Sequence, residues 1–143
     1  MLKKKHTKYI GIDYGKKRTG ISISDHNKVI SFPLDTIETK SLMFYLKDLI
    51  ENEKIEKVVI GKPLKLNNKL HELEIDIIQF IKSLKSIFPQ IIIERIDERY
   101  TSKISSLIIR QSGINQKSRM NKSIIDKISA SLILEAYLIK INK

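Results

Sequence analysis

Acidic residues stand at three places in this 143-residue chain where carboxylates are suited to hold a metal ion. Asp13 lies between two glycines at the end of a short apolar run, and the pair Asp97 and Glu98 ends a later one. Asp126 opens the last amphipathic segment. Mg²⁺ prefers hard oxygen ligands, and two ions about 3.5–4 Å apart can clamp the attacking and leaving oxygens of a phosphodiester. Converging carboxylates flanked by basic segments indicate Mg²⁺-dependent phosphodiester cleavage.

The first two positions also have structural interpretations. An aspartate between two glycines, as at position 13, is typical of a tight turn. One member of the pair Asp97 and Glu98 can form an ion pair with Arg95 or Arg99. Strand alternation places Asp97 and Glu98 on opposite faces, so only one of them is expected to face a metal site.

The third position has the strongest structural alternative. Ser123 precedes Asp126 by three residues, which is the spacing of a helix capping box. A carboxylate in a first helical turn is stabilised by the helix dipole in any case. Spacing alone therefore favours a structural role for Asp126, and the metal-site hypothesis depends on the acidic positions meeting in the fold.

The net charge of +11 is unevenly distributed, with 27 Lys and Arg against 16 Asp and Glu. Residues 1–32 and residues 95–143 each carry a net +6, whereas residues 33–94 carry −1. An A/T-biased coding sequence can account for part of the total, since Lys and Ile are both abundant. The two basic ends nevertheless contain the acidic candidates, and they indicate a polyanionic partner.

Length and composition limit the possible classes of protein. The 143 residues predict a single domain over 1–143, with 1–7 as a basic N-terminal tail. The absence of Cys excludes a disulfide scaffold and a thiolate metal site. The basic N-terminus is not followed by an apolar signal region, and no run approaches the length of a membrane span. We expect a cytoplasmic protein with no membrane partner.

Hydrophobic periodicity predicts an α/β domain. Strands are expected at 9–13, 19–25, 29–34, 57–60 and 91–96. Helices are expected at 40–52, 70–88 and 123–140, together with one capped by Thr101 or Ser102 and ended by Gly113. Three antiparallel strands followed by right-handed βα crossovers give a mixed five-stranded sheet flanked by helices. Pro33 places the third strand at an edge or a strand end.

Five sequence blocks, in order, resemble the YqgF/RuvX family over nearly the whole chain. They are Gly11-Ile-Asp-Tyr-Gly-Lys-Lys-Arg-Thr-Gly20, Pro33-Leu-Asp-Thr-Ile37, Val58-Val-Ile-Gly-Lys-Pro-Leu64, Asp97-Glu-Arg-Tyr-Thr-Ser102 and Asp126-Lys-Ile-Ser-Ala130 with its following apolar residues. The motif Gly-x-Asp-x-Gly is weak by itself, but the ordered set is specific.

The resemblance implies an RNase H-like fold and nuclease activity. It implies processing of the 5′ end of pre-16S ribosomal RNA, or Holliday-junction resolution by analogy with RuvC. The metal-binding acids of that family, which bind two Mg²⁺ or Mn²⁺ ions, are resembled by Asp13, Glu98 and Asp126. Asp97 is the alternative to Glu98. Arg99 resembles an arginine found at this place in the family, and its expected catalytic role is to stabilise the charge that develops on the phosphate.

Basic residues near these acids are candidates for binding a nucleic-acid backbone. Such contacts position a nucleic acid without reading its sequence. The alternative for the first three, which follow Asp13, is a solvated turn. The candidates are Lys16, Lys17, Arg18, Arg110, Lys117, Arg119 and Lys122.

Three functional classes are compatible with these features. The favoured one is a metal-dependent nuclease acting on structured RNA of the small ribosomal subunit. A junction-specific DNA endonuclease would use the same chemistry on branched DNA. The second is a non-catalytic nucleic-acid-binding ribosome assembly factor, for which the basic ends suffice. The third, an actin- or Hsp70-like ATPase, is disfavoured because 143 residues supply one lobe and not two. Either a monomer or a homodimer is compatible with the chain.

Overall fold

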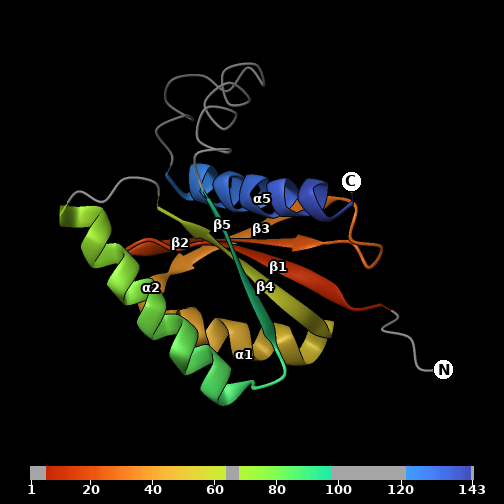
Figure 1. Cartoon of the computed structure of the whole chain (residues 1–143), viewed down its shortest axis with the longest axis horizontal. Coiled ribbons are helices and arrows are strands. Elements are labelled where there is room, and N and C mark those ends of the chain that lie inside the picture. The colour runs from red at the N-terminus through yellow and green to blue at the C-terminus, as the bar shows by residue number, and fades with distance from the viewer. Residues whose placement is uncertain (1–5, 64–67, 98–121, 143) are drawn as a thin grey trace.

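A five-stranded mixed sheet forms the centre of the computed structural model, which describes residues 6–63, 68–97 and 122–142 (Figure 1). The strand order is β3-β2-β1-β4-β5, with β1 (Lys8–Asp13) in the middle. Consecutive residues of β1 are buried although their side chains point to opposite faces of the sheet. This pattern fits a central strand, which is covered on both sides. The predicted mixed five-stranded sheet is confirmed.

The first three strands form an antiparallel meander. β1 pairs with β2 (Arg18–Ser24), and β2 pairs with β3 (Ser31–Glu38) at the edge of the sheet. Pro33 lies on this edge strand, where a missing N–H is tolerated. The predicted edge position of Pro33 is confirmed.

Two crossovers then add parallel strands on the other side of β1. The 3₁₀ turn η1 (Thr39–Ser41) and helix α1 (Leu42–Glu53) lead to β4 (Ile55–Lys62). Helix α2 (Asn68–Ile87) leads to β5 (Ile92–Asp97), and both strands run parallel to β1. The carboxyl ends of β1, β4 and β5 therefore lie at one end of the sheet.

The helices cover the two faces unequally. Helices α1 and α2 pack on one face, and the long helix α5 (Lys122–Ile141) lies across the other (Figure 1). The core against α1 and α2 contains Ile10, Ile12 and Leu46, whereas the core against α5 contains Val59 and Leu134. In the described part of the chain, no helix is both long and apolar enough to cross a membrane.

The third strand differs from the prediction of 29–34, because the preceding turn is longer than expected. The Asp25 carboxylate accepts hydrogen bonds from the backbone N–H groups of Asn27, Val29 and Ile30 at 2.8–3.1 Å. Lys28 has a φ of 59°, and this left-handed residue closes the turn. The strand therefore begins at Ser31 and continues past Pro33 to Glu38.

Candidate active site

Asp13 and Asp126 approach each other across a glycine. Asp13 ends β1, and its partner in the antiparallel ladder is Gly20. A Cβ atom at Gly20 would lie 2.0 Å from the carbonyl oxygen of Asp126, so the backbone of α5 rests directly on this glycine. Cross-strand neighbours share one face of a sheet, with Cβ positions about 4.5–5.5 Å apart. The structure thus brings together two of the three predicted acidic positions.

A second glycine, Gly11, lies against helix α5 one turn after Asp126. A Cβ atom at Gly11 would lie 2.7 Å from Cβ of Leu134 and 2.8 Å from the carbonyl oxygen of Ala130. The buried Ser22 hydroxyl, opposite Gly11 in the ladder, donates to that Ala130 oxygen at 2.8 Å. Small residues on β1 and β2 therefore hold α5 close to the sheet, a role that sequence analysis missed for Gly11 and Gly20.

Asp126 forms an ion pair and does not cap the helix. Helix α5 begins at Lys122, so Ser123 lies inside the helix, and the capping-box interpretation is wrong. The Asp126 carboxylate instead accepts a hydrogen bond from Arg18 Nε at 2.9 Å on Oδ2. Both side chains are partly exposed, 39% for Arg18 and 22% for Asp126. A positive charge already sits against one of the predicted metal ligands.

The basic turn between β1 and β2 is fixed by Thr39. The Thr39 N–H donates to the Lys17 carbonyl at 2.9 Å, and its hydroxyl donates to the Gly15 carbonyl at 2.6 Å. The same hydroxyl lies 2.7 Å from that of buried Thr19. Lys16 and Lys17 are exposed on this turn, so their backbone is held while their side chains face solvent.

Lys16 also lies 3.7 Å from Glu72 of α2, with both side chains well exposed. An exposed pair of this kind contributes little to stability. Lys16 thus remains available to a polyanion.

Asp97 and Arg95 lie on the α2 side of β5. Arg95 donates to both carboxylate oxygens of Glu74, at 2.8 and 2.9 Å, and to the carbonyl of Gly61 at 3.1 Å. The hydrogen bonds from Arg95 lower the pKa of Glu74 below its ordinary value. Arg95 thus binds Glu74 in the structure, and Glu98 and Arg99, the other residues of the predicted pairing, lie outside the described residues.

Alternation along β5 separates Asp97 from the α5 side. Ile96 packs in the core against α5, so the next residue, Asp97, projects toward the opposite face. Asp13 and Asp126 lie on the α5 face. Asp97 is therefore not directed toward them.

Tyr14, directly after Asp13, belongs to the core. Its ring lies 5.6 Å from that of Phe80, between centroids, and burial raises the pKa of its hydroxyl. The phenol therefore stays protonated near neutral pH.

Several predicted site residues fall outside the described part of the chain. They are Glu98, Arg99, Arg110, Lys117 and Arg119, together with the helix expected before Gly113. In residues 6–63, 68–97 and 122–142, no group of three or more acidic or histidine side chains is arranged to hold a metal. The predicted third acid, Glu98, is not among those residues.

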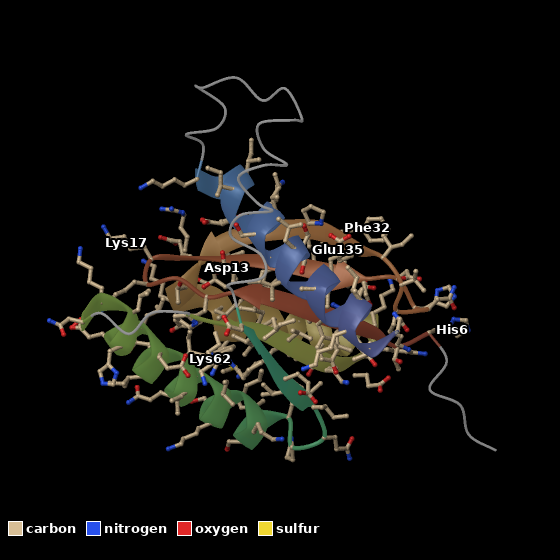
Figure 2. All side chains as sticks on the ribbon, turned by 45° about the horizontal axis from the view of Figure 1, so that its top comes forward. His6, Asp13, Lys17, Phe32, Lys62 and Glu135 are labelled. Atoms are coloured by element: carbon tan, nitrogen blue, oxygen red, sulfur yellow. The ribbon has the colours of Figure 1, made fainter. Side chains whose placement is uncertain are left out.

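Two more lysines lie at the same end of the sheet. Lys122, predicted from sequence, is exposed at the start of α5. Lys62 is exposed at the end of β4, opposite Asp97 in the ladder, and was not among the predicted residues. Figure 2 labels Asp13, Lys17 and Lys62 at one end of the sheet, with His6 and Phe32 at the other. The position of Lys62 directly after a buried strand was the available sequence signal.

The arrangement has the components of a cation-dependent site beside an anion-binding surface. Asp13 and Asp126 supply hard oxygen donors, which suit Mg²⁺ or Mn²⁺. The cationic Arg18 lies against Asp126, so this carboxylate is already partnered by a positive charge. Exposed lysines surround the same end of the sheet.

Comparison with known proteins gives matches over nearly the whole chain. A profile of the family described as "RuvX: Holliday junction resolvase" matches residues 7–140. A Bacteroides fragilis protein named "Putative pre-16S rRNA nuclease" is 37% identical over 132 residues, covering 92% of this chain and 96% of that protein. A Flavobacterium johnsoniae protein of the same name is 42% identical over 129 residues, covering 90% of this chain and 94% of that one.

A solved structure shares the fold. The chain titled "T. thermophilus RuvC in complex with Holliday junction substrate" aligns with a TM-score of 0.62, covering 96% of this chain and 98% of that one. The two sequences are only 11% identical. This similarity confirms the predicted RNase H-like fold.

Proposed function

Since this chain belongs to the RuvX family, we propose that it is a metal-dependent nuclease that processes the 5′ end of pre-16S ribosomal RNA. The observation that carries the proposal is the meeting of Asp13 and Asp126 across Gly20, beside Arg18. The names of the relatives favour RNA as the substrate, whereas the family description favours a four-way DNA junction.

Asp13 and Asp126 are the proposed ligands of Mg²⁺ or Mn²⁺, two ions in all. When bound, such ions activate water and stabilise the leaving oxygen of a phosphodiester. The carboxylate of Asp13 is held at the end of a buried central strand, and that of Asp126 is held by a helix pressed against the sheet. Each side chain therefore has a fixed backbone position from which to bind a cation.

Glu98 is the proposed third acid. Asp97 projects toward the α2 side, away from Asp13 and Asp126, which leaves Glu98 as the better candidate of the two neighbouring acids. Arg99 follows, and its proposed role is to stabilise charge that develops on the phosphate.

The basic residues around this end are proposed to hold the nucleic-acid backbone. Lys16, Lys17 and Lys122 are exposed there, whereas Lys62 at the end of β4 lies on the α2 side, near Glu74. Arg110, Lys117 and Arg119 are included because they lie between Glu98 and Asp126 in sequence. Backbone contacts of this kind favour shape over base sequence.

The small ribosomal subunit precursor is the proposed partner, and the cytoplasm the proposed location, because ribosomal RNA is matured there. A monomer suffices to cut one RNA strand. Symmetric cutting of a DNA junction needs two sites, so a homodimer belongs to that alternative.

The decisive experiment compares two substrates and two variants. A pre-16S-like RNA and a four-way DNA junction are incubated with wild type, Asp13→Asn and Asp48→Asn, each with Mg²⁺ and with excess chelator. Asp48 is an exposed aspartate on α1, on the opposite face of the sheet, and serves as the matched control. We expect cleavage of the RNA by wild type and Asp48→Asn, and none by Asp13→Asn or in chelator.

Other outcomes identify the alternatives. Cleavage of the junction alone would replace the RNA substrate with branched DNA. Undiminished cleavage in chelator would overturn the metal mechanism. Full biological complementation by a folded Asp13→Asn variant would favour a non-catalytic assembly factor that binds nucleic acid.

A further inference from the structure

Arg18 holds Asp126 with only part of its hydrogen-bonding capacity. A guanidinium has five N–H donors. Among the described contacts, Nε donates to Asp126 Oδ2 at 2.9 Å, and neither terminal nitrogen has a recorded protein acceptor. The side chain is 39% exposed, so the terminal nitrogens are accessible from solvent. Arg18 is thus both a counterion of Asp126 and a donor available to an incoming anion.

The two roles compete through charge. A guanidinium beside a carboxylate reduces its attraction for a divalent cation, because the like charges repel at short range. A phosphate that binds the terminal nitrogens of Arg18 supplies the compensating negative charge. Asp126 is then released from Arg18 and presents a full negative charge to the cation.

The backbone near Arg18 is suited to an exchange of side-chain partners without movement of the chain. Arg18 is the first residue of β2 and pairs with Glu38 in the ladder. The preceding turn is held by Thr39, whose N–H and hydroxyl bind the carbonyls of Lys17 and Gly15. The Arg18 side chain can therefore rotate away from Asp126 while its backbone stays in place.

We infer that Arg18 couples the binding of substrate phosphate to the binding of the divalent cation at Asp126, by exchanging one negatively charged partner for the other. This inference rests on the proposed function, because it requires a cation at Asp126. The free protein binds the cation weakly, and a bound phosphate backbone strengthens that binding. Thermodynamic linkage requires the reciprocal effect, in which the cation strengthens binding of the nucleic acid by the same factor.

A titration of the full chain with Mn²⁺ tests the coupling. The dissociation constant is measured with and without a short blunt DNA duplex, which carries phosphates but neither proposed substrate structure, and gel electrophoresis verifies that the duplex stays intact. The proteins are wild type, Arg18→Gln, Arg18→Lys and Lys47→Gln. Lys47→Gln removes one positive charge from an exposed position on α1, on the opposite face of the sheet, and circular dichroism checks that every variant is folded.

The expected pattern is specific to Arg18. For wild type, the duplex tightens Mn²⁺ binding about tenfold, within the usual range of coupling between sites. Arg18→Gln binds Mn²⁺ tightly without the duplex and shows a coupling factor near one. Arg18→Lys, which keeps the charge, retains weak binding in the free protein. Lys47→Gln retains the wild-type coupling.

The contrary results separate this inference from the proposed function. If Arg18→Gln binds Mn²⁺ no more tightly than wild type and keeps the wild-type coupling, Arg18 is only a structural link between β2 and α5, and the inference is overturned. If wild type binds no Mn²⁺ with or without the duplex, the proposed metal centre itself is overturned.

Discussion

Gly20 lies directly beneath the backbone of Asp126, so closely that a Cβ atom would be 2.0 Å from its carbonyl oxygen and 2.4 Å from its carbonyl carbon. Gly20 is also the ladder partner of Asp13. The absence of one side chain therefore sets the separation between the end of β1 and the start of α5.

We predict that Gly20→Ala lowers both stability and cleavage activity. Strand propensity alone would favour Ala over Gly. The steric conflict is with backbone and not with a flexible side chain, so α5 must shift, at a cost of about 1–3 kcal/mol in the free energy of unfolding. A shift of about 1 Å in a catalytic ligand can reduce the rate about 100-fold. Chemical denaturation and the RNA cleavage assay measure the two effects.

Gly11→Ala is the matched control for that substitution. It also conflicts with α5, but at Ala130 and Leu134, further from Asp126. We expect a similar loss of stability with a smaller loss of activity. Equal losses of activity in the two variants would indicate a general effect of helix displacement and not a local effect on Asp126.

We predict that Thr39→Val loosens the basic turn and weakens nucleic-acid binding. Val keeps the shape of Thr but removes the hydroxyl that binds the Gly15 carbonyl and the Thr19 hydroxyl. Loss of these partners in a partly buried environment, with the buried Thr19 hydroxyl left unpaired, costs about 1–3 kcal/mol. Denaturant unfolding measures the stability, and fluorescence anisotropy with a labelled RNA measures the binding.

A second variant separates the contributions at Thr39. Thr19→Val combined with Thr39→Val leaves no unpaired hydroxyl at position 19. The double variant should therefore be more stable than the sum of the single effects predicts. Strict additivity would show that the contact between the two hydroxyls is unimportant.

We predict that Glu74→Gln lowers stability by about 1–2 kcal/mol at neutral pH, because the bidentate pair with Arg95 loses its charge. The pKa of Glu74 is lowered in the folded protein, so the stabilisation is complete above the ordinary glutamate value and is lost as pH falls through the folded value. The difference in stability between wild type and Glu74→Gln should shrink as pH falls below about 4.5. Denaturation curves from pH 7 to acid measure it, and a constant difference would contradict the assigned cause.

We predict a steep salt dependence of nucleic-acid binding. Each neutralised phosphate releases counterions, so the logarithm of the binding constant falls linearly with the logarithm of salt concentration. Replacing Lys16 and Lys17 together with Gln should reduce the slope by about 2. Replacing the exposed Lys47 and Lys85, on α1 and α2, should leave it unchanged. A slope that does not respond to the turn lysines would exclude them from the interface.

Much of the fold followed from local patterns in the sequence. The alternation in β1 and β2 and the helical spacing in α2 are short-range features, so each element was predicted close to its observed bounds. The start of β3 was wrong because the Asp25 turn depends on one carboxylate binding three backbone N–H groups, a geometry that residue types alone do not specify.

The chemical groups of the candidate site could be predicted from residue types, because carboxylates and basic side chains are read directly from them. Which of these groups meet depends on the tertiary packing. Arg18 and Asp126 are 108 residues apart in the chain, and their contact depends on how closely α5 approaches the sheet. That approach is set by Gly11 and Gly20, where the absence of a Cβ atom matters only once another element packs there. Likewise, Arg95 binds Glu74, 21 residues away in the chain, because strand alternation directs it toward α2.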